Sequence, residues 1–274
     1  MHFITLSRQL GSNGTEIARQ VAQKLEYAFI DTEAIDRRAK EMGLLESVSE
    51  MDEKTPSLFQ RIFTHRPAIN LARLNSVIFE LTKQGDAVFV GRGGHMLLRN
   101  FDCALHVRVV ASRKRRIKNL VNRGYDEKSA EEAIANSDRE RSGFMKFAFG
   151  VDWENSQLYD LVLNMDKLGI GSAVDTIVSL ARSGEIKACS LTALETLENQ
   201  ALVARVEAAI TEAGLSYGPG TSVFVSVDRP GRVRLSGIVE DEQSKVRAEE
   251  VVKRVNGVEA VENEIRIARL DRHA

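Results

Sequence analysis

Short apolar runs and helical repeats alternate along the first two thirds of the chain. Apolar runs of three to seven residues predict strands, and apolar positions three or four apart predict helices. The predicted strands are 3–6, 27–30, 87–90, 104–110 and 161–163. The predicted helices are 16–25, 32–42, 69–84, 112–123, 127–147 and 171–182. This order predicts an α/β domain at residues 1–182, with a parallel sheet and helices on both of its faces.

The pattern changes after residue 182. Residues 183–194 lack a periodic pattern and are predicted to be a linker. The rest predicts a small α+β domain at 195–270 in the order αββαβ, with elements at 195–213, 222–228, 232–239, 242–255 and 260–267. Earlier in the chain, the polar segment Glu46–Pro67 is interrupted by prolines, and it is either an arm over a site or a connector.

Composition narrows the class of protein. Hydrophobic residues make up 43% and charged residues 28%, which is typical of a globular protein. The formal net charge of −1 excludes a general basic coat, so no nucleic acid partner is expected. No apolar run is long enough for a transmembrane helix, and no signal sequence precedes the first strand, so we expect a cytoplasmic protein. Cys103 and Cys189 have no metal-type spacing and do not require a disulfide.

The segment from Ile4 to Ile17 carries the main chemical signal. It has a strand, a glycine-containing loop and a helix start, the order that forms a phosphate-binding turn. Gly11 and Gly14 allow the backbone to approach an anion closely. The general P-loop pattern, however, would place glycine at Arg8 and lysine at Gly14. By this pattern alone, a purely structural turn stays open.

The run SRQLGSNGTEI at residues 7–17 resembles the start of the cytidylate kinase-like family. The resemblance continues through 29–31, 91–93, 138–141 and 161–170, and it covers residues 1–182. It implies a P-loop kinase-like fold that transfers a phosphoryl group from ATP, with Mg²⁺, to a nucleoside monophosphate. CMP or dCMP is the acceptor that the resemblance implies. In cytidylate kinases an acid precedes the glycine–arginine turn, whereas this chain has Val90 there.

Phosphoryl transfer needs positive groups that converge from separate elements. Without a loop lysine, another cation must hold the β and γ phosphates, and Arg8 is the nearest candidate for this catalytic role. The resemblance assigns catalytic roles to Arg139 and Arg141, in a lid that closes on the transferring phosphate. It assigns ATP binding to Gly11, Ser12, Asn13, Gly14, Thr15 and Glu16, with Thr15 also as the Mg²⁺ ligand. It assigns acceptor binding to Asp31, Arg92 and Asp138, where Asp138 either orients the lid arginines or contacts the sugar.

Each assignment has a structural alternative. Arg92 is otherwise an ordinary surface arginine, and Asp31 a cap of the following helix. The cluster 138–141 is otherwise a solvated helix face with local ion pairs. The run Arg113–Arg116 is expected to be a solvated face rather than a nucleotide clamp. His95 and His106 are expected to be structural. The missing lysine and the Val90 departure leave a second function open, a nucleotide-binding regulator without turnover.

The C-terminal region resembles a BON domain. The matching runs are VRLSGIV at 233–239 and VNGVEAVEN at 255–263. The resemblance implies binding to a phospholipid surface or to a protein partner, and no catalytic residues. The region is net acidic, which disfavours an anionic membrane. We therefore expect an assembly or regulatory role, while a purely structural appendage and a homo-oligomer stay open.

Overall fold

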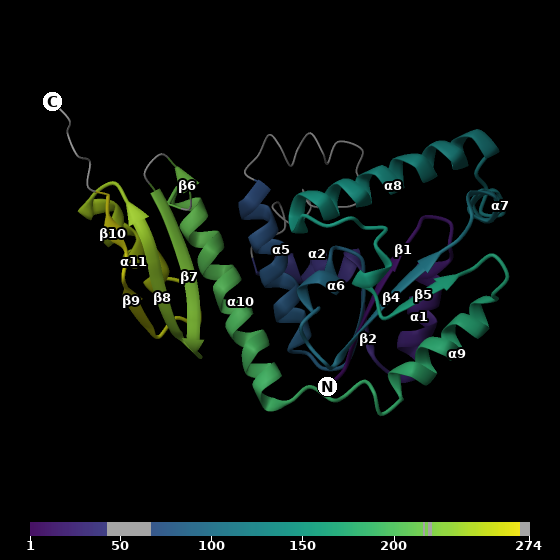
Figure 1. Cartoon of the computed structure of the whole chain (residues 1–274), viewed down its shortest axis with the longest axis horizontal. Helices are drawn as coiled ribbons and strands as arrows, with labels where there is room; N and C mark the ends of the chain where they lie inside the picture. Colours follow the sequence, from purple (N-terminus) through teal and green to yellow (C-terminus); the bar gives the residue numbers. More distant parts are fainter. Residues whose placement is uncertain (43–66, 216, 219–220, 269–274) are drawn as a thin grey trace.

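The structure is a computed structural model, and it describes residues 1–42, 67–215, 217–218 and 221–268. Five parallel strands form the first sheet in the order β2-β3-β1-β4-β5. Figure 1 shows this sheet with helices packed around it. These strands are β1 (Phe3–Arg8), β2 (Ala28–Ile30), β3 (Ala87–Val90), β4 (Ala104–Val110) and β5 (Leu161–Asn164). The predicted α/β class is confirmed. Of the polar segment Glu46–Pro67, predicted as an arm or a connector, residues 46–66 lie outside the described residues, and Pro67 is the first residue of helix α5 (Pro67–Thr82).

Helices cover both faces of this sheet, because its strands carry apolar side chains on both sides. Ile4 and Leu6 face α1 (Gly14–Leu25) and α9 (Ile170–Ala181). Phe3 faces the other core, which contains residues of α2 (Thr32–Glu41), α5 (Pro67–Thr82) and α8 (Glu127–Phe149). Three further helices connect these layers: α6 (Gly94–Leu97), α7 (Arg113–Val121) and the 3₁₀ turn η1 (Ser156–Leu158).

The C-terminal part forms a second, mixed sheet. Its elements are α10 (Leu191–Glu212), β6 (Tyr217–Gly218), β7 (Thr221–Arg229), β8 (Arg232–Val239), α11 (Glu242–Lys253), β9 (Ala260–Asn263) and β10 (Arg266–Ile267). The strand order is β10-β8-β7-β6, and β9 also pairs with β8. The predicted strand 260–267 is therefore two strands. They separate where the Asn263 side chain accepts the Ile265 amide at 3.2 Å.

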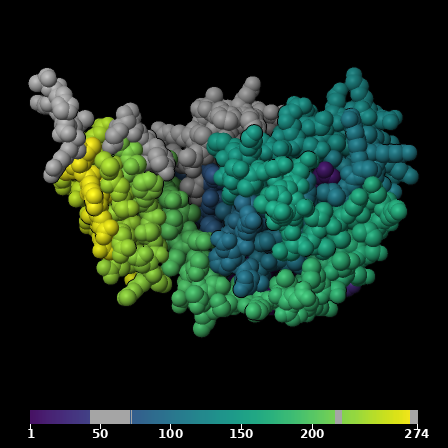
Figure 2. Space-filling model, viewed as in Figure 1, coloured from purple at the N-terminus to yellow at the C-terminus, as the bar shows by residue number. Residues whose placement is uncertain are grey.

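Helix α10 starts four residues earlier than predicted. Ser190 caps it by accepting the Ala193 amide at 3.1 Å, so the end of the predicted linker is helical. The helix lies between α5 and the second sheet (Figure 1). Its apolar residues enter two cores, the first through Leu197, Ala201 and Ala204, and the second through Leu202, Val206 and Ile210. In Figure 2 the two parts of the chain lie in direct contact along this helix.

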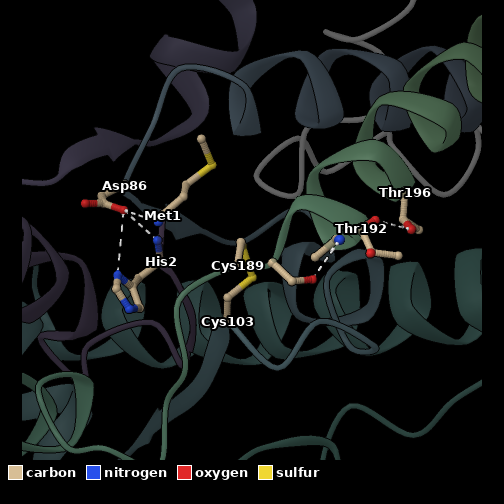
Figure 3. The surroundings of a disulfide bond; sticks show 9 residues. Met1, His2, Asp86, Cys103, Cys189, Thr192 and Thr196 are labelled. Atoms are coloured by element: carbon tan, nitrogen blue, oxygen red, sulfur yellow. Dashed lines mark hydrogen bonds and ion pairs between the residues drawn. A yellow bond between two sulfur atoms is a disulfide. The ribbon is translucent and has the colours of Figure 1, made fainter. Parts of the chain in front are cut away.

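A disulfide joins the two parts close to the start of α10. Cys103, just before β4, is bonded to Cys189, just before α10, across 86 residues of sequence (Figure 3). The Cys189 amide also donates to the carbonyl of Met1 at 2.9 Å. Chain spacing alone did not require this bond, because the fold brings the two segments together. None of the described helices is long and apolar enough to cross a membrane.

Candidate functional site

The turn between β1 and α1 has the shape of an anion-binding loop. Gly11 has a φ of 81° and Asn13 a φ of 65°, both in the left-handed region. The chain bends there so that α1 begins at Gly14, and the Asn13 side chain does not cap the first N–H groups of the helix. A cavity of about 500 Å³ is lined by this turn. Free N–H groups at a helix N-terminus favour an anion such as phosphate.

The walls of this cavity are mainly positive. They carry one carboxylate, Glu16, and four arginines, which are Arg8, Arg19, Arg123 and Arg141. Of the loop residues predicted to bind ATP, the structure brings Gly11, Asn13, Gly14, Thr15 and Glu16 to the cavity. Ser12 is not on its lining, because its side chain is fully buried and donates to the carbonyl of Gln9 at 2.8 Å. Ser12 therefore closes the turn from inside.

Arg8 fills the space that a side chain at position 14 would need. A Cβ added to Gly14 would lie 2.4 Å from the Arg8 Cβ and 3.0 Å from its Cγ. Contacts this short force a neighbour to move. The Arg8 Nε donates to the Thr15 hydroxyl at 3.5 Å, at the edge of the cavity. The loop thus packs against the stem of one long cation, Arg8. That Arg8 replaces the loop lysine stays a prediction.

Helix α7 binds the carbonyl side of the loop. Arg116 donates from Nε to the Leu10 carbonyl at 2.7 Å, and Asn119 donates to the Gly11 carbonyl at 2.8 Å. Helix α7 therefore satisfies two carbonyls of the loop with side-chain donors. A Cβ on Gly11 would lie 2.7 Å from the Arg116 carbonyl, so this approach also requires a glycine.

Asp138 on α8 binds the same arginine. Its two oxygens accept from the Arg116 Nη1 and Nη2 at 2.8 and 2.7 Å. The prediction that 113–116 is a solvated face is wrong for Arg116, which is 4% exposed, and right for the exposed Arg113. The contact that the structure gives Asp138 is therefore with α7. Such a bidentate pair fixes orientation, so α8 and the loop are held together through one side chain.

The two predicted lid arginines differ in position. Arg141 is buried, lines the cavity and donates to the Ser137 hydroxyl. Arg139 is exposed and is not part of the cavity lining, because it lies on another side of α8. The structure therefore brings Arg141, and not Arg139, to the phosphate loop.

Two of the three predicted acceptor residues, Asp31 and Arg92, follow the ends of β2 and β3. Arg92 is 1% exposed, so the alternative of an ordinary surface arginine is wrong. Its φ of 50° is unusual for a residue with a side chain, and such conformations cluster at functional sites. Its Nη2 lies 3.2 Å from the Asp36 carboxylate on α2. Asp31 caps α2 by accepting the Ala34 amide at 3.1 Å, which is the structural role proposed as its alternative.

A magnesium ion would find two oxygen ligands at the cavity. The Thr15 hydroxyl and the Glu16 carboxylate both line it, whereas Val90 is apolar and buried. Mg²⁺ is bound by few protein oxygens, and water and phosphate complete its shell. These residues therefore fit a partial Mg²⁺ site. Within the described ranges, no cluster of three or more His, Cys, Asp or Glu side chains has metal-binding geometry.

Both histidines expected to be structural are buried in contacts with protein groups. The His106 Nδ1 lies 2.7 Å from the Thr5 hydroxyl, and the His95 ring stacks on Tyr159 with 4.9 Å between ring centres. Burial lowers the pKa of the His106 imidazole. Sequence reasoning missed Arg19 on α1 and Arg123 in the turn after α7, since an exposed arginine that lines a cavity has the same sequence signal as a solvated one.

Comparisons with known proteins identify a family for each of the two parts of the chain. The model of the cytidylate kinase-like family matches residues 3–167, and that of the BON domain matches 199–269. A cytidylate kinase of Pyrobaculum neutrophilum is 30% identical over 179 residues, which is 64% of this chain and 89% of that protein. A cytidylate kinase of Methanocella arvoryzae is 29% identical over 172 residues, 60% of this chain and 87% of that protein.

A solved structure supports the fold of the first domain. It is an uncharacterized protein from Eubacterium ventriosum, 20% identical, with a TM-score of 0.54 over 67% of this chain and 99% of that one. Sheet order, loop geometry and the extent of the family match point the same way. The chain belongs to the cytidylate kinase-like family, with a P-loop kinase-like α/β domain followed by a BON domain.

Proposed function

We propose that this protein is a kinase that transfers the γ-phosphoryl group of ATP to a nucleoside monophosphate, with CMP or dCMP as the acceptor. The observation that carries the proposal is the arginine-lined cavity at the N-terminus of α1, where Arg8 takes the space vacated at Gly14. A nucleotide substrate is further supported by the 30% identity to a cytidylate kinase.

In this proposal the protein groups act by positioning and by neutralising charge, which is what phosphoryl transfer requires. The amides at the start of α1 bind the phosphate chain of ATP. Arg8 and Arg141 neutralise the charge that spreads over the transferred group. Arg is permanently charged and binds phosphate oxygens in pairs, so it is a chemically adequate substitute for lysine. Arg92 binds the phosphate of the acceptor.

Mg²⁺ would be held by Thr15 and Glu16 together with phosphate oxygens and water. When bound, it would supply positive charge that neutralises the phosphate groups. Glu16 is otherwise a negative group facing a negative ligand. The Glu16 carboxylate therefore favours ATP binding only when a cation accompanies the phosphates.

The test measures ADP formation from ATP and Mg²⁺ with CMP, dCMP, UMP, AMP and GMP in turn. Arg8→Met removes the proposed cation, and Arg113→Met is the matched control on an exposed site paired with Glu131 at 3.4 Å. We expect turnover with CMP or dCMP, a loss of about 10²–10³-fold in Arg8→Met and no loss in the control. ATP binding without ADP formation in the parent protein would refute the kinase.

That last outcome would favour the second candidate, a nucleotide-binding regulator. One observation supports a regulatory connection to the BON domain. Glu80 on α5 pairs with Arg205 on α10 and lies 3.7 Å from Arg38 on α2, the helix that carries Asp36. In this proposal Arg205→Met changes the affinity for CMP more than that for ATP, measured by calorimetry. If Arg205→Met changes the affinities for CMP and ATP equally, a regulatory connection between the BON domain and the acceptor site is refuted.

A further inference from the structure

Arg108 is a buried cation on an otherwise apolar stretch of β4. Its neighbours Val107 and Val109 face the core covered by α1 and α9, so its side chain lies on the opposite face of the sheet. Its register partner on β1 is Ser7, the residue before Arg8. Arg108 is only 4% exposed, although it carries a full charge. Charged side chains are rarely buried to this extent unless they have a partner.

Two aromatic rings from the segment after α8 flank the guanidinium. Its Cζ lies 4.5 Å from the centre of the Trp153 ring and 5.4 Å from that of Tyr159. Both rings are held in place, since the Trp153 Nε1 donates to the Ser7 hydroxyl at 2.8 Å and the Tyr159 hydroxyl donates to the Trp153 carbonyl at 3.1 Å. Such contacts occupy the faces of a guanidinium and leave its N–H edges for an acceptor.

No protein acceptor meets those edges in the part of the chain that the structure describes. The Nη1 of Arg108 is buried there without a hydrogen-bond partner. Burial lowers the pKa of Arg108, although Tyr159 and the carboxylates of Glu154, Asp152 and Asp138 oppose this change. None of these carboxylates is within ion-pair distance among the described contacts, and Asp138 is bound to Arg116. A buried donor without a partner calls for a ligand or an unseen group.

We propose that Arg108 binds a phosphate oxygen of the acceptor nucleotide, held ready by Trp153 and Tyr159. The inference rests on the proposed kinase function. A desolvated planar cation with unused N–H groups matches an anionic oxygen. The acceptor is the fitting nucleotide, because Arg108 shares its face of the sheet with α2, whose Asp36 pairs with Arg92. The cavity at the loop, in contrast, is lined by other arginines.

The test uses Trp153, the single tryptophan of the chain, as a reporter beside Arg108. The full-length protein is titrated with CMP, with ATP and with inorganic phosphate, while tryptophan emission and calorimetric heat are recorded. In the parent protein we expect CMP to change the emission. In Arg108→Met we expect CMP affinity to fall about 30-fold or more, and ATP affinity to change less than about twofold. Arg113→Met, on the exposed face of α7, should behave as the parent does.

Thermal melting separates this role from a merely structural one. If the role of Arg108 is to bind a ligand, Arg108→Met should have a Tm at or above that of the ligand-free parent. It should also lose the increase in Tm that CMP causes in the parent. If the methionine variant does not fold, Arg108→Lys keeps the charge without the planar N–H edge, and it should still lose CMP affinity. Unchanged CMP affinity in a folded variant would overturn the inference and leave the kinase proposal standing. A parent protein that binds neither ATP nor CMP would overturn both.

Discussion

Replacing Gly14 by alanine tests whether the Arg8 side chain fills the space that a residue at position 14 needs. The added Cβ would lie 2.4 Å from the Arg8 Cβ, about 1 Å closer than ordinary contact, and 3.4 Å from the Leu6 Cδ2. Overpacking of this kind costs about 1–3 kcal/mol. Against it stands a gain of up to about 1 kcal/mol, because alanine is a better helix former than glycine.

The sign of the effect should therefore depend on residue 8. With Arg8 present, Gly14→Ala should lower the free energy of unfolding. In an Arg8→Gly background the clashing Cβ is absent, and the same change should be neutral or stabilising. The coupling free energy of the double-mutant cycle should be about 1–3 kcal/mol. This corresponds to a shift in Tm of about 2–12 °C for a domain of this size.

Equilibrium urea unfolding of the four ligand-free proteins measures this coupling. Gly171→Ala is the matched control, because Gly171 is also in the first turn of a long helix and a Cβ there would meet nothing within 4 Å. It should show only the propensity gain. If alanine at position 14 has the same effect in the parent and in the Arg8→Gly variant, the steric argument is refuted. The double variant Arg8→Gly with Gly14→Lys should then be no better folded than Gly14→Lys alone.

Three more predictions concern the surroundings of the site. Arg116→Met removes the link between the loop and Asp138 on α8. It should lower the free energy of unfolding in urea titration by about 2–4 kcal/mol and weaken ATP binding. Unchanged ATP affinity in the folded variant would contradict a role of Arg116 in holding the loop. Replacing Cys103 and Cys189 by serine should lower the free energy of unfolding by about 4–5 kcal/mol, because the disulfide closes a loop across a sequence separation of 86 residues. A parent protein whose Tm does not change with reductant would contradict this prediction. Burial lowers the pKa of His106 in the folded protein. The neutral imidazole therefore contributes fully to the free energy of unfolding above about pH 6.5, and this contribution is lost as the pH falls through the lowered pKa. His106→Gln should make the fall of Tm below that pH less steep.

The parts of the fold that depend on local periodicity were predictable from the sequence. The bounds of β3 and β4 agree with the predicted 87–90 and 104–110, because buried strands are rich in apolar and β-branched residues. The bend at the phosphate loop followed from glycine at position 11. A capping role for Asp31 was one of two open alternatives, and the hydrogen bond from the Ala34 amide shows this role.

Other features depend on contacts between distant segments, which one sequence does not reveal. Arg116 looked like one of several solvated arginines, and only the packing of α7 on α8 brings it to Asp138. Arg108 carried a weak signal, a charge within an apolar strand, whose meaning depends on Trp153 and Tyr159 many residues later. The start of α10 was missed because its apolar residues point in two directions and lack a single-sided pattern.

That two-sided helix has a consequence for how the protein is divided. Cutting the chain after residue 182 would remove Leu197, Ala201 and Ala204 from the core of the α/β domain and leave an apolar surface on α5. The excised α/β fragment would then be exposed to aggregation, and low activity of such a fragment would say nothing about its chemistry. The family matches end at 167 and resume at 199, so the start of α10 lies outside both of them, although this helix contributes side chains to both cores.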